Sequence, residues 1–520
     1  MKHELETERL ALQQRLDDSK TQAERNRLGQ FATPTRLALD IMQLAGHLLG
    51  RRTAIRFLDP AIGTGSFYSA VLTVFPPSRI RWARGFEIDP HYGRPAKALW
   101  AGRGLDIELA DFTALTPPSD ESGRADLIVC NPPYVRHHHL SRQEKVRLSR
   151  ATTRACGVSL TGRSGLYCHF LGLCHAWLAE GGVALWLVPG EFMDMNYGTP
   201  LKHYLLDRVT LERIHRFDPF DAQFVDALVS SAVIAYRKAL PMDGHAVRFT
   251  YGGTLAEPRL RRDVTIDMLT PKRKWSGLAA AGADGAAEPV TRLADLFRIR
   301  RGVATGANDL FILPVAKAEA LGLPGEVLRP ILPSPRLLNV DEVDSDSRGL
   351  PRIDRPHVLI DCSLPADEVR RCYPRLWAYL SGGAARGIRD RYLCRHRDPW
   401  YAQERRLPAP LLCTCMGRRK GDRPTFRFIL NHSQAVAANG YLMLYPRPPL
   451  AQAIAGDRTR LRAVWQALAS ADAESLIGVG HVYGGGLHKV EPRELAAASA
   501  AAVLQVVPEA EPIRAMLFRG

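Results

Sequence analysis

The stretch from Ala125 to Tyr134 constrains the fold more than any other part of the chain. It reads ADLIVCNPPY: an apolar run that predicts a buried parallel strand, followed at once by Asn131 and two prolines. Pro132 and Pro133 have no N–H to donate, and Pro133 keeps Pro132 out of the helical region, so the strand must end there in a rigid, extended corner. Ligands of open α/β sheets bind at the carboxyl ends of the strands. We therefore expect a ligand site at this corner.

The corner offers groups that suit a planar base with an exocyclic amino group. Asn131 contributes a side-chain amide, Pro132 a backbone carbonyl that the sheet leaves unpaired, and Tyr134 a flat ring. Two acceptors can take both hydrogens of an amino group while the ring stacks on the base. A simple strand-ending turn would use the same residues, so the functional interpretation depends on the neighbouring motifs.

A glycine-containing loop follows an earlier predicted strand, Ile55–Asp59. Residues 60–67 read PAIGTGSF and lead into a predicted helix. Gly63 and Gly65 would let the backbone approach a ligand closely at the helix N-terminus. The loop lacks the third glycine of the dinucleotide fingerprint and the Gly-Lys-Ser/Thr of a P-loop, so its glycines alone are weak support for a nucleotide site.

Acidic residues end the next two predicted strands. Glu87 lies in the strand 84–88, about 20 residues after the glycine loop, where a carboxylate can bind both hydroxyls of a ribose. Asp111 and Phe112 follow the strand 106–110 and suit the amino group and ring face of an adenine. Each acid alone could be a solvated strand end. Asp59 ends the first predicted strand, so three strands in succession, at β-α-β spacing, end in an acidic residue. This pattern predicts a nucleotide-like cofactor.

Composition favours a nucleic-acid-binding protein of the reducing cytoplasm. The 520 residues predict two or three domains, and the net charge of +16 suggests a polyanionic partner, with nucleic acid ahead of a membrane surface, although a protein can be basic without one. Nine scattered cysteines show no disulfide framework, and Cys413 and Cys415 lack a second pair at zinc-ligand spacing, so we expect them in the core or a loop. The polar start is unlike a signal peptide, and no apolar stretch reaches the roughly 18 residues of a membrane span.

Regions of the chain differ in character. Residues 1–27 are highly charged with helically spaced leucines, which predicts a helical arm that either covers the next domain or lies along DNA. Residues 28–240 have an α/β pattern, 241–292 read as a connecting segment, and 293–520 predict short strands with many prolines and arginines. Aromatic residues interleave with these arginines, which suits contacts to phosphates and base edges. These aromatic residues are Trp400, Tyr401, Phe426, Phe428 and Tyr441.

Two further features have more than one interpretation. The consecutive histidines His137–His139 invite a metal site, but neighbouring side chains diverge and no further ligand set is present in the sequence. We expect a solvated basic loop near the substrate instead. Phe224 leads into the predicted late strand 229–236 and is either a core residue or a second wall of a base pocket.

Taken together, these residues resemble the gamma-class N6-adenine DNA methyltransferases of bacterial type II restriction–modification systems. The resemblance covers roughly residues 28–238 and rests on the order of motifs: the Thr33-Pro34 segment, the DPAIGTGSF loop, Glu87, Asp111 and NPPY. Two later stretches are similar to parts of the family's recognition domains. They are Gly302–Asp309 and Asn431–Pro446.

The resemblance implies a fold and a domain order. It implies a seven-stranded, Rossmann-like sheet that binds S-adenosylmethionine, followed by a mixed α+β target-recognition domain. The catalytic domain would then span 28–240, behind the helical arm 1–27, and the recognition domain would span 293–520 after the connecting segment 241–292.

The resemblance also implies the roles of single residues. Asn131, Pro132 and Tyr134 would hold the target adenine, with Phe224 on its other face. The implied cofactor-binding residues are Gln30, Phe31, Thr33, Asp59, Ala61, Gly63, Gly65, Glu87, Ile88, Asp111, Phe112 and Asn131. Candidate DNA-binding residues from the basic clusters are Arg300, Arg301, Arg395, Arg397, Arg418, Arg419 and Lys420. One departure is Gly165, which stands where the family usually has Asp or Asn before Leu-Tyr, so a side-chain contact is not expected there.

The expected reaction is transfer of a methyl group from S-adenosylmethionine to N6 of a flipped-out adenine in duplex DNA, without a metal. An RNA adenine methyltransferase or a protein glutamine N-methyltransferase could use the same NPPY corner, but both are usually built without a large domain after the catalytic one. The 27 residues before the predicted catalytic domain are too few for a nuclease. We therefore expect a cytoplasmic, monomeric modification enzyme, alone or beside a separately encoded restriction endonuclease.

Overall fold

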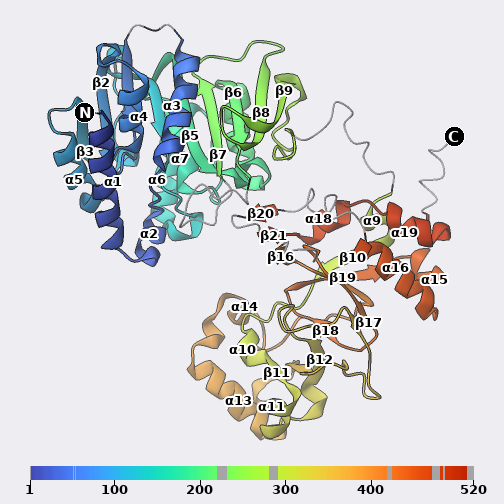
Figure 1. Ribbon diagram of the computed structural model, residues 1–520. Helices are drawn as coiled ribbons and strands as arrows, with labels where there is room; N and C mark the ends of the chain where they lie inside the picture. The colour runs from blue at the N-terminus through green and yellow to red at the C-terminus, as the bar shows by residue number, and fades with distance from the viewer. Residues whose placement is uncertain are drawn as a thin grey trace. The chain divides into compact units, whose positions relative to one another are not determined.

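The computed structural model has two compact units (Figure 1). It describes residues 2–50, 52, 54–218, 231–279, 291–418, 424–470, 481–483 and 487–511. The first unit takes the chain to Ala286 together with Tyr483–Gly485, and the second takes the remainder.

A nine-stranded sheet forms the centre of the first unit, in the order β3-β2-β1-β4-β5-β7-β6-β8-β9. Strands β1 to β5 are parallel, and β7 runs antiparallel between β5 and β6. These seven strands confirm the predicted Rossmann-like methyltransferase sheet. Their bounds are β1 Ile55–Asp59, β2 Ile80–Glu87, β3 Leu105–Leu109, β4 Ala125–Cys130, β5 Leu178–Pro189, β6 Thr210–Arg216 and β7 Ser231–Arg237.

The sheet continues past residue 240, inside the segment that the sequence predicted as a connection. β8 (Ala246–Gly253) pairs parallel to β6, and β9 (Pro258–Thr265) pairs antiparallel to β8. β9 reads PRLRRDVT and is largely exposed. Its sequence does not alternate between apolar and polar residues, which is the pattern that predicts a strand. Residues 246–265 therefore extend the sheet instead of linking two domains.

Helices cover both faces of this sheet and enclose two cores. α3 (Thr35–Leu49), α4 (Ser66–Val74) and α5 (Pro90–Trp100) pack in one core. α7 (Leu166–Cys174) and α8 (Thr199–Asp207) pack in the other, together with the end of α6 (Arg142–Cys156). Successive residues of β4 and β5 alternate between the two cores, so both faces of these strands are buried.

The parallel strands bring the predicted site residues to one edge. In register, Asp59 of β1 lies opposite Gly85 of β2, and Glu87 of β2 lies opposite Leu109 of β3. β4 is buried along its whole length and ends at Cys130, directly before the NPPY corner. The predicted strand before NPPY is thus confirmed, and its end joins those of β1, β2 and β3 at the carboxyl edge.

The N-terminal arm forms two helices, α1 (Lys2–Asp18) and α2 (Gln22–Leu28). α1 contacts α4 and α5, and its Arg9 is only 1% exposed. Of the two roles expected for the arm, the structure therefore shows the first: the arm covers the neighbouring domain.

Within its described residues, the second unit contains three small sheets. A five-stranded sheet has the order β10-β19-β15-β17-β13, a four-stranded one β11-β14-β12-β18, and a three-stranded one β16-β21-β20. The strands are β10 Phe297–Arg301, β11 Ile312–Pro314, β12 Leu328–Leu332, β13 Glu342–Val343, β14 His357–Ile360, β15 Leu411–Thr414, β16 Met416–Arg418, β17 Phe428–Asn431, β18 Val436–Ala437, β19 Tyr441–Pro446, β20 His481–Tyr483 and β21 Leu487–Lys489. The helices are α9 Leu293–Leu296, α10 Asn308–Phe311, α11 Val315–Ala320, α12 Ala366–Cys372, α13 Pro374–Ala385, α14 Tyr392–Arg395, α15 Leu450–Ala453, α16 Arg458–Ser470, α18 Pro492–Ala497 and α19 Ala501–Val506.

The two stretches that resemble recognition domains lie against each other in this unit. Gly302 donates its N–H to the carbonyl of Tyr441 at 2.9 Å, and Val303 donates to Ala437 at 2.8 Å. A Cβ on Gly302 would lie 2.2 Å from the carbonyl oxygen of Ala438, so only glycine fits there. These residues hold the unit together.

Most aromatic residues that interleave with the arginines are core residues. Tyr401 and Tyr441 are fully buried, and Phe426 and Phe428 are at most 5% exposed. Their expected role at base edges is therefore wrong for the structure as it stands, because their rings are covered by protein. Cys413 and Cys415 are also buried, which confirms that they are core cysteines.

Candidate active site

Asn131 leaves two acceptors open at the NPPY corner. Its Nδ2 donates to the carbonyl of Phe31 at 2.9 Å and to Oγ1 of Thr33 at 3.2 Å. Within the described ranges, no hydrogen bond is made to Asn131 Oδ1 or to the carbonyl of Pro132. Because the Phe31 carbonyl can only accept, it fixes which end of the amide faces away from it. The two acceptors that the sequence predicted are thus available together.

Tyr134 is held rigidly beside them. Its hydroxyl donates to the carbonyl of Leu187 at 3.1 Å, and its ring lies 5.7 Å from that of Phe31 at 41°. Burial raises the pKa of Tyr134 well above its ordinary value, so the phenol stays neutral and keeps this bond. A ring anchored at its far end is a suitable fixed platform for a base.

Thr33 does not cap the helix that follows it. α3 begins at Thr35, and the residue at its N-cap is Pro34, which has no side-chain capping bond. Thr33 is 7% exposed, and its hydroxyl accepts the bond from Asn131 instead. Threonine before proline is a common start of a helix, but here a residue about 100 positions later in the chain takes the hydroxyl.

Gly29 is a site residue that the sequence reasoning missed. Its φ is +65°, and a Cβ on it would lie 2.3 Å from the backbone nitrogen of Tyr134. The Tyr134 N–H also donates to the Gly29 carbonyl at 3.3 Å. The loop before α3 thus packs directly on the NPPY backbone. The only sequence signal was a glycine just before the Gln30-Phe31 pair.

The two loop glycines have different roles. Gly63 has φ +54°, and a Cβ there would meet nothing within 4 Å, so the loop is open on that side. Gly65 has φ +91°, but a Cβ there would lie 2.4 Å from Nε1 of Trp100. Gly65 is therefore required for packing on α5, whereas Gly63 borders space that a ligand can enter.

The carboxylates below the loop are buried and bound to backbone N–H groups. Asp59 accepts from Ala61 at 3.1 Å, and burial raises the pKa of Asp59 to about 7. Glu87 accepts from Gly63 at 3.0 Å and from Asp89 at 2.9 Å, and burial also raises its pKa. Each acid shapes the loop above it as well as offering oxygens to a ligand.

The end of β3 matches the prediction only in part. Asp111 accepts from the N–H and hydroxyl of Thr113 at 2.9 and 2.7 Å, and its carboxylate is partly exposed. Phe112 is 3% exposed and packs 5.1 Å from Trp177 in the core, so its ring face is not open. Ile88, in contrast, is 63% exposed beside Glu87 and offers an apolar surface at this edge.

The N-terminal arm reaches the same loops. Arg9 donates to Oγ1 of Thr64, between the two loop glycines, at 3.1 Å. Gln30, one of the implied cofactor-binding residues, donates to Asp89 at 2.8 Å, and Lys20 of the arm forms an ion pair with the same carboxylate. Although burial acts to raise it, these bonds hold the pKa of Asp89 below its usual range.

The remaining predicted residues are dispersed. Phe224, Arg419 and Lys420 lie outside the described residues. Arg300, Arg395 and Arg418 are exposed in the second unit. Arg301 forms an ion pair with Glu491 at 2.9 Å, and Arg397 donates to the carbonyls of Ala304 and Thr305, so these two are structural in this state.

Gly165 lies close to the backbone that follows NPPY. A Cβ there would lie 3.3 Å from the carbonyl oxygen of Val135, and Leu166 donates its N–H to that carbonyl at 3.0 Å. No group of three or more histidine, cysteine, aspartate or glutamate side chains in the described ranges is placed to hold a metal, His137–His139 included. None of the helices described is both long and apolar enough to cross a bilayer.

Comparison with known proteins decides the family. The family model "Eco57I restriction-modification methylase" matches residues 86–222, and "Type II methyltransferase M.Eco57I, C-terminal domain" matches residues 282–517. The chain belongs to the type II restriction–modification methyltransferases. These enzymes are DNA methyltransferases, and their cofactor is S-adenosylmethionine.

Relatives match along most of the chain. It is 28% identical over 476 residues to Type II methyltransferase M.XamI of Xanthomonas campestris pv. amaranthicola, which covers 90% of this chain and 84% of that protein. It is 25% identical to Type II methyltransferase M.AccI of Acinetobacter calcoaceticus, over 91% of this chain and 85% of that protein. The solved structure of the Type IIL restriction-modification enzyme MmeI in complex with DNA is similar over 93% of this chain and 73% of that chain, with 12% identity and a TM-score of 0.48.

The carboxyl edge fits such a cofactor. Gly63 borders open space at the N-terminus of α4, and exposed Ile88 provides an apolar surface next to it. Glu87 presents a carboxylate that two backbone N–H groups already orient, as binding of paired hydroxyls requires. The donor set therefore suits a small nucleoside-like molecule.

Proposed function

We propose that this chain is a site-specific DNA methyltransferase that methylates N6 of an adenine flipped out of duplex DNA. One observation carries the proposal: Asn131 Oδ1 and the Pro132 carbonyl are both free to accept, at the end of β4, while the Asn131 amide is held in one orientation by Phe31. Two acceptors fit an amino group, which has two hydrogens to donate. A ring nitrogen or ring carbon as the target would not use both.

The two acceptors act on the nucleophile. The adenine amino nitrogen is a weak nucleophile because its lone pair is delocalised into the ring. Hydrogen bonds from its two protons to Asn131 and Pro132 favour a tetrahedral nitrogen with a localised lone pair. S-adenosylmethionine supplies an activated methyl group when bound. The protein then contributes mainly positioning and electrostatic placement, with no covalent bond to the enzyme.

Stacking of the base on Tyr134 offsets part of the free energy that base flipping costs. Extruding a base costs a few kcal/mol, and stacking on an aromatic ring is worth about 1–3 kcal/mol per base. Because the Tyr134 hydroxyl is anchored to Leu187, the ring is in place before the base arrives and loses little freedom on binding.

The assignments extend to the cofactor edge and the second unit. We infer that Asp59, Gly63 and Glu87 line the S-adenosylmethionine site and that the second unit recognises the target sequence, with Arg300, Arg395 and Arg418 among its DNA contacts. In this account the enzyme is a monomeric, cytoplasmic modification component that acts alone or beside a separately encoded endonuclease. Methylation of RNA adenine or of protein glutamine has less support, because the match over 282–517 is to a type II DNA methyltransferase domain.

Substitution of Asn131 tests the role of the corner. Asn131→Ala removes one of the two acceptors, so methyl transfer to DNA should fall below detection. Binding of S-adenosylmethionine, measured by calorimetry, should persist because the cofactor edge is intact. Loss of cofactor binding in Asn131→Ala, or full methyl transfer by it, would contradict the assigned role.

A further inference from the structure

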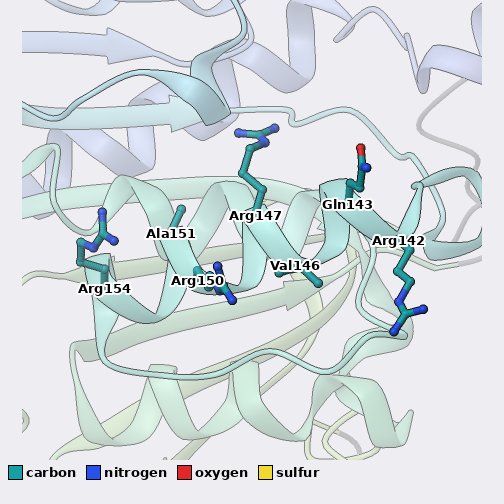
Figure 2. Close-up of a pocket in the computed structure, with 7 residues that line it drawn as sticks. All are labelled: Arg142, Gln143, Val146, Arg147, Arg150, Ala151 and Arg154. Atoms are coloured by element: carbon teal, nitrogen blue, oxygen red, sulfur yellow. The ribbon is translucent and has the colours of Figure 1, made fainter.

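Helix α6 carries a row of arginines along one side. At about 100° per residue, Arg142, Arg147, Arg150 and Arg154 fall within about 140° of its circumference. Leu148 faces away from this row and is buried. Figure 2 shows the four guanidinium groups extending from the helix, with the shorter Ala151 among them. The row borders an open hollow of about 590 Å³.

Three of these arginines have no acidic partner among the described residues. Arg142, Arg150 and Arg154 are exposed and form no ion pair there, whereas exposed Arg248 in the same unit pairs with Asp263 at 2.9 Å. The one acid of the helix, Glu144, is engaged with Ser141 in a capping box. Arg147 differs from the other three, because it donates to Thr113 and lies 3.4 Å from Asp111.

This arrangement is unfavourable for the free helix. Arg150 and Arg154 are four residues apart, where like charges repel each other. Arg142 stands in the first turn, where the helix dipole favours acids. A sequence that places uncompensated cations at such positions points to an anionic ligand.

The row lies beside the candidate active site. The bonds from Arg147 to Thr113 fix α6 next to the carboxyl end of β3. The segment that joins NPPY to α6 adds His137–His139. Burial, and then the neighbouring charges of His138, Lys145 and Arg163, lower the pKa of His137, so this imidazole is mostly neutral at neutral pH and adds hydrogen-bonding groups instead of charge. The arginines of α6 therefore form a positively charged surface next to the carboxyl end of β3.

We propose that this arginine row binds the DNA backbone next to the flipped adenine. The inference rests on the proposed function and adds a contact surface on the catalytic unit. From Arg142 to Arg154 the helix rises about 18 Å, which equals the rise of about five base pairs at 3.4 Å each. Phosphate contacts of this kind position the protein and carry no sequence information. The occupant of the hollow is the phosphodiester backbone of duplex DNA.

The test compares two triple variants of the full chain. The first is Arg142→Gln/Arg150→Gln/Arg154→Gln. The control, Arg15→Gln/Arg94→Gln/Lys97→Gln, removes the same charge from exposed positions on α1 and α5, which pack with the opposite core. Affinity for a 30-base-pair duplex of mixed sequence is measured by fluorescence anisotropy at several salt concentrations. Affinity for S-adenosylmethionine is measured in parallel as a check on folding.

Each phosphate contact contributes about 0.9 to the slope of log affinity against log salt. The α6 variant should therefore lose about 2.7 from this slope if all three arginines bind phosphate. The ratio of the affinity of the unsubstituted protein to that of the α6 variant should therefore fall about 40-fold between 50 and 200 mM salt. The control should keep the original slope, and all three proteins should bind the cofactor equally.

Other results separate the two inferences. An unchanged slope in the α6 variant, with methyl transfer to DNA intact in the unsubstituted protein, overturns the surface and leaves the proposed function standing. An equal change in the control overturns it too, because the effect would then be one of net charge. Preference of the unsubstituted protein for RNA over duplex DNA, in binding and in transfer, overturns both.

Discussion

Thr33→Val isolates the hydrogen bond that links the loop before α3 to the NPPY corner. Valine keeps the shape of threonine but removes the hydroxyl that accepts from Asn131 Nδ2 at 3.2 Å. The bond from Nδ2 to the Phe31 carbonyl at 2.9 Å remains, so the amide keeps its orientation but loses one of two restraints on its position. A neutral hydrogen bond contributes about 0.5–1.5 kcal/mol. At about 1.4 kcal/mol per factor of ten, the rate of transfer should fall about 2- to 10-fold.

The assay is single-turnover methyl transfer with saturating DNA and cofactor. Thr33→Ser restores a hydroxyl and should recover most of the rate. Thr35→Val is the matched control, because the Thr35 hydroxyl bonds to Glu6 and not to Asn131. The Kd for S-adenosylmethionine should stay within about twofold in Thr33→Val. An unchanged rate in Thr33→Val would refute this role of the hydroxyl. A defect confined to cofactor affinity would also refute it and would indicate that Thr33 belongs to the cofactor site.

Three further predictions concern the surrounding loops. Gly29→Ala places a Cβ 2.3 Å from the Tyr134 nitrogen at φ +65°, so it should reduce the transfer rate more than Thr33→Val does in the same assay; full activity would show that the loop does not pack there. Burial raises the pKa of Asp59 from 3.8 to about 7, so ionisation of this carboxyl destabilises the fold as pH rises between these values. The gain in Tm of Asp59→Asn over the unsubstituted protein should therefore grow from pH 4 to 7 and then level off. A gain that is independent of pH would exclude ionisation of Asp59 as its cause. Arg9→Met removes the bond to Thr64 and should weaken cofactor binding several-fold by calorimetry; unchanged binding would make the arm a cover only.

The sheet and its site edge were predictable where the signal was local. The strand β4 is apolar throughout and ends at two prolines, so residues 125–134 alone determine a buried strand and a corner. The spacing of Glu87 and Asp111 after Asp59 reflects parallel strands whose ends share an edge. The position of these residues follows from the period of β-α-β units.

Other features depend on contacts that sequence does not display. The Thr33 hydroxyl could cap a helix or bind Asn131, and only the folded chain brings Asn131 to it. β9 is a strand because β8 offers it a partner, although its own residues are mostly polar and exposed.

Burial in the second unit was also hidden. Tyr401 and Tyr441 stand near arginines in sequence, which resembles a nucleic-acid surface, but both rings are fully buried. Arg397 likewise binds backbone carbonyls of its own unit. Neighbours in sequence therefore indicated the overall charge of this unit but not which side chains reach solvent.

The most direct test of the central claim is the identity of the methylated product. Labelled methyl from S-adenosylmethionine is offered in parallel to unmethylated duplex DNA, total RNA and a protein extract, and the products are digested to nucleosides or amino acids. The account predicts label in N6-methyladenine from DNA and its loss in Asn131→Ala. Label in N4-methylcytosine, in RNA or in glutamine would contradict it.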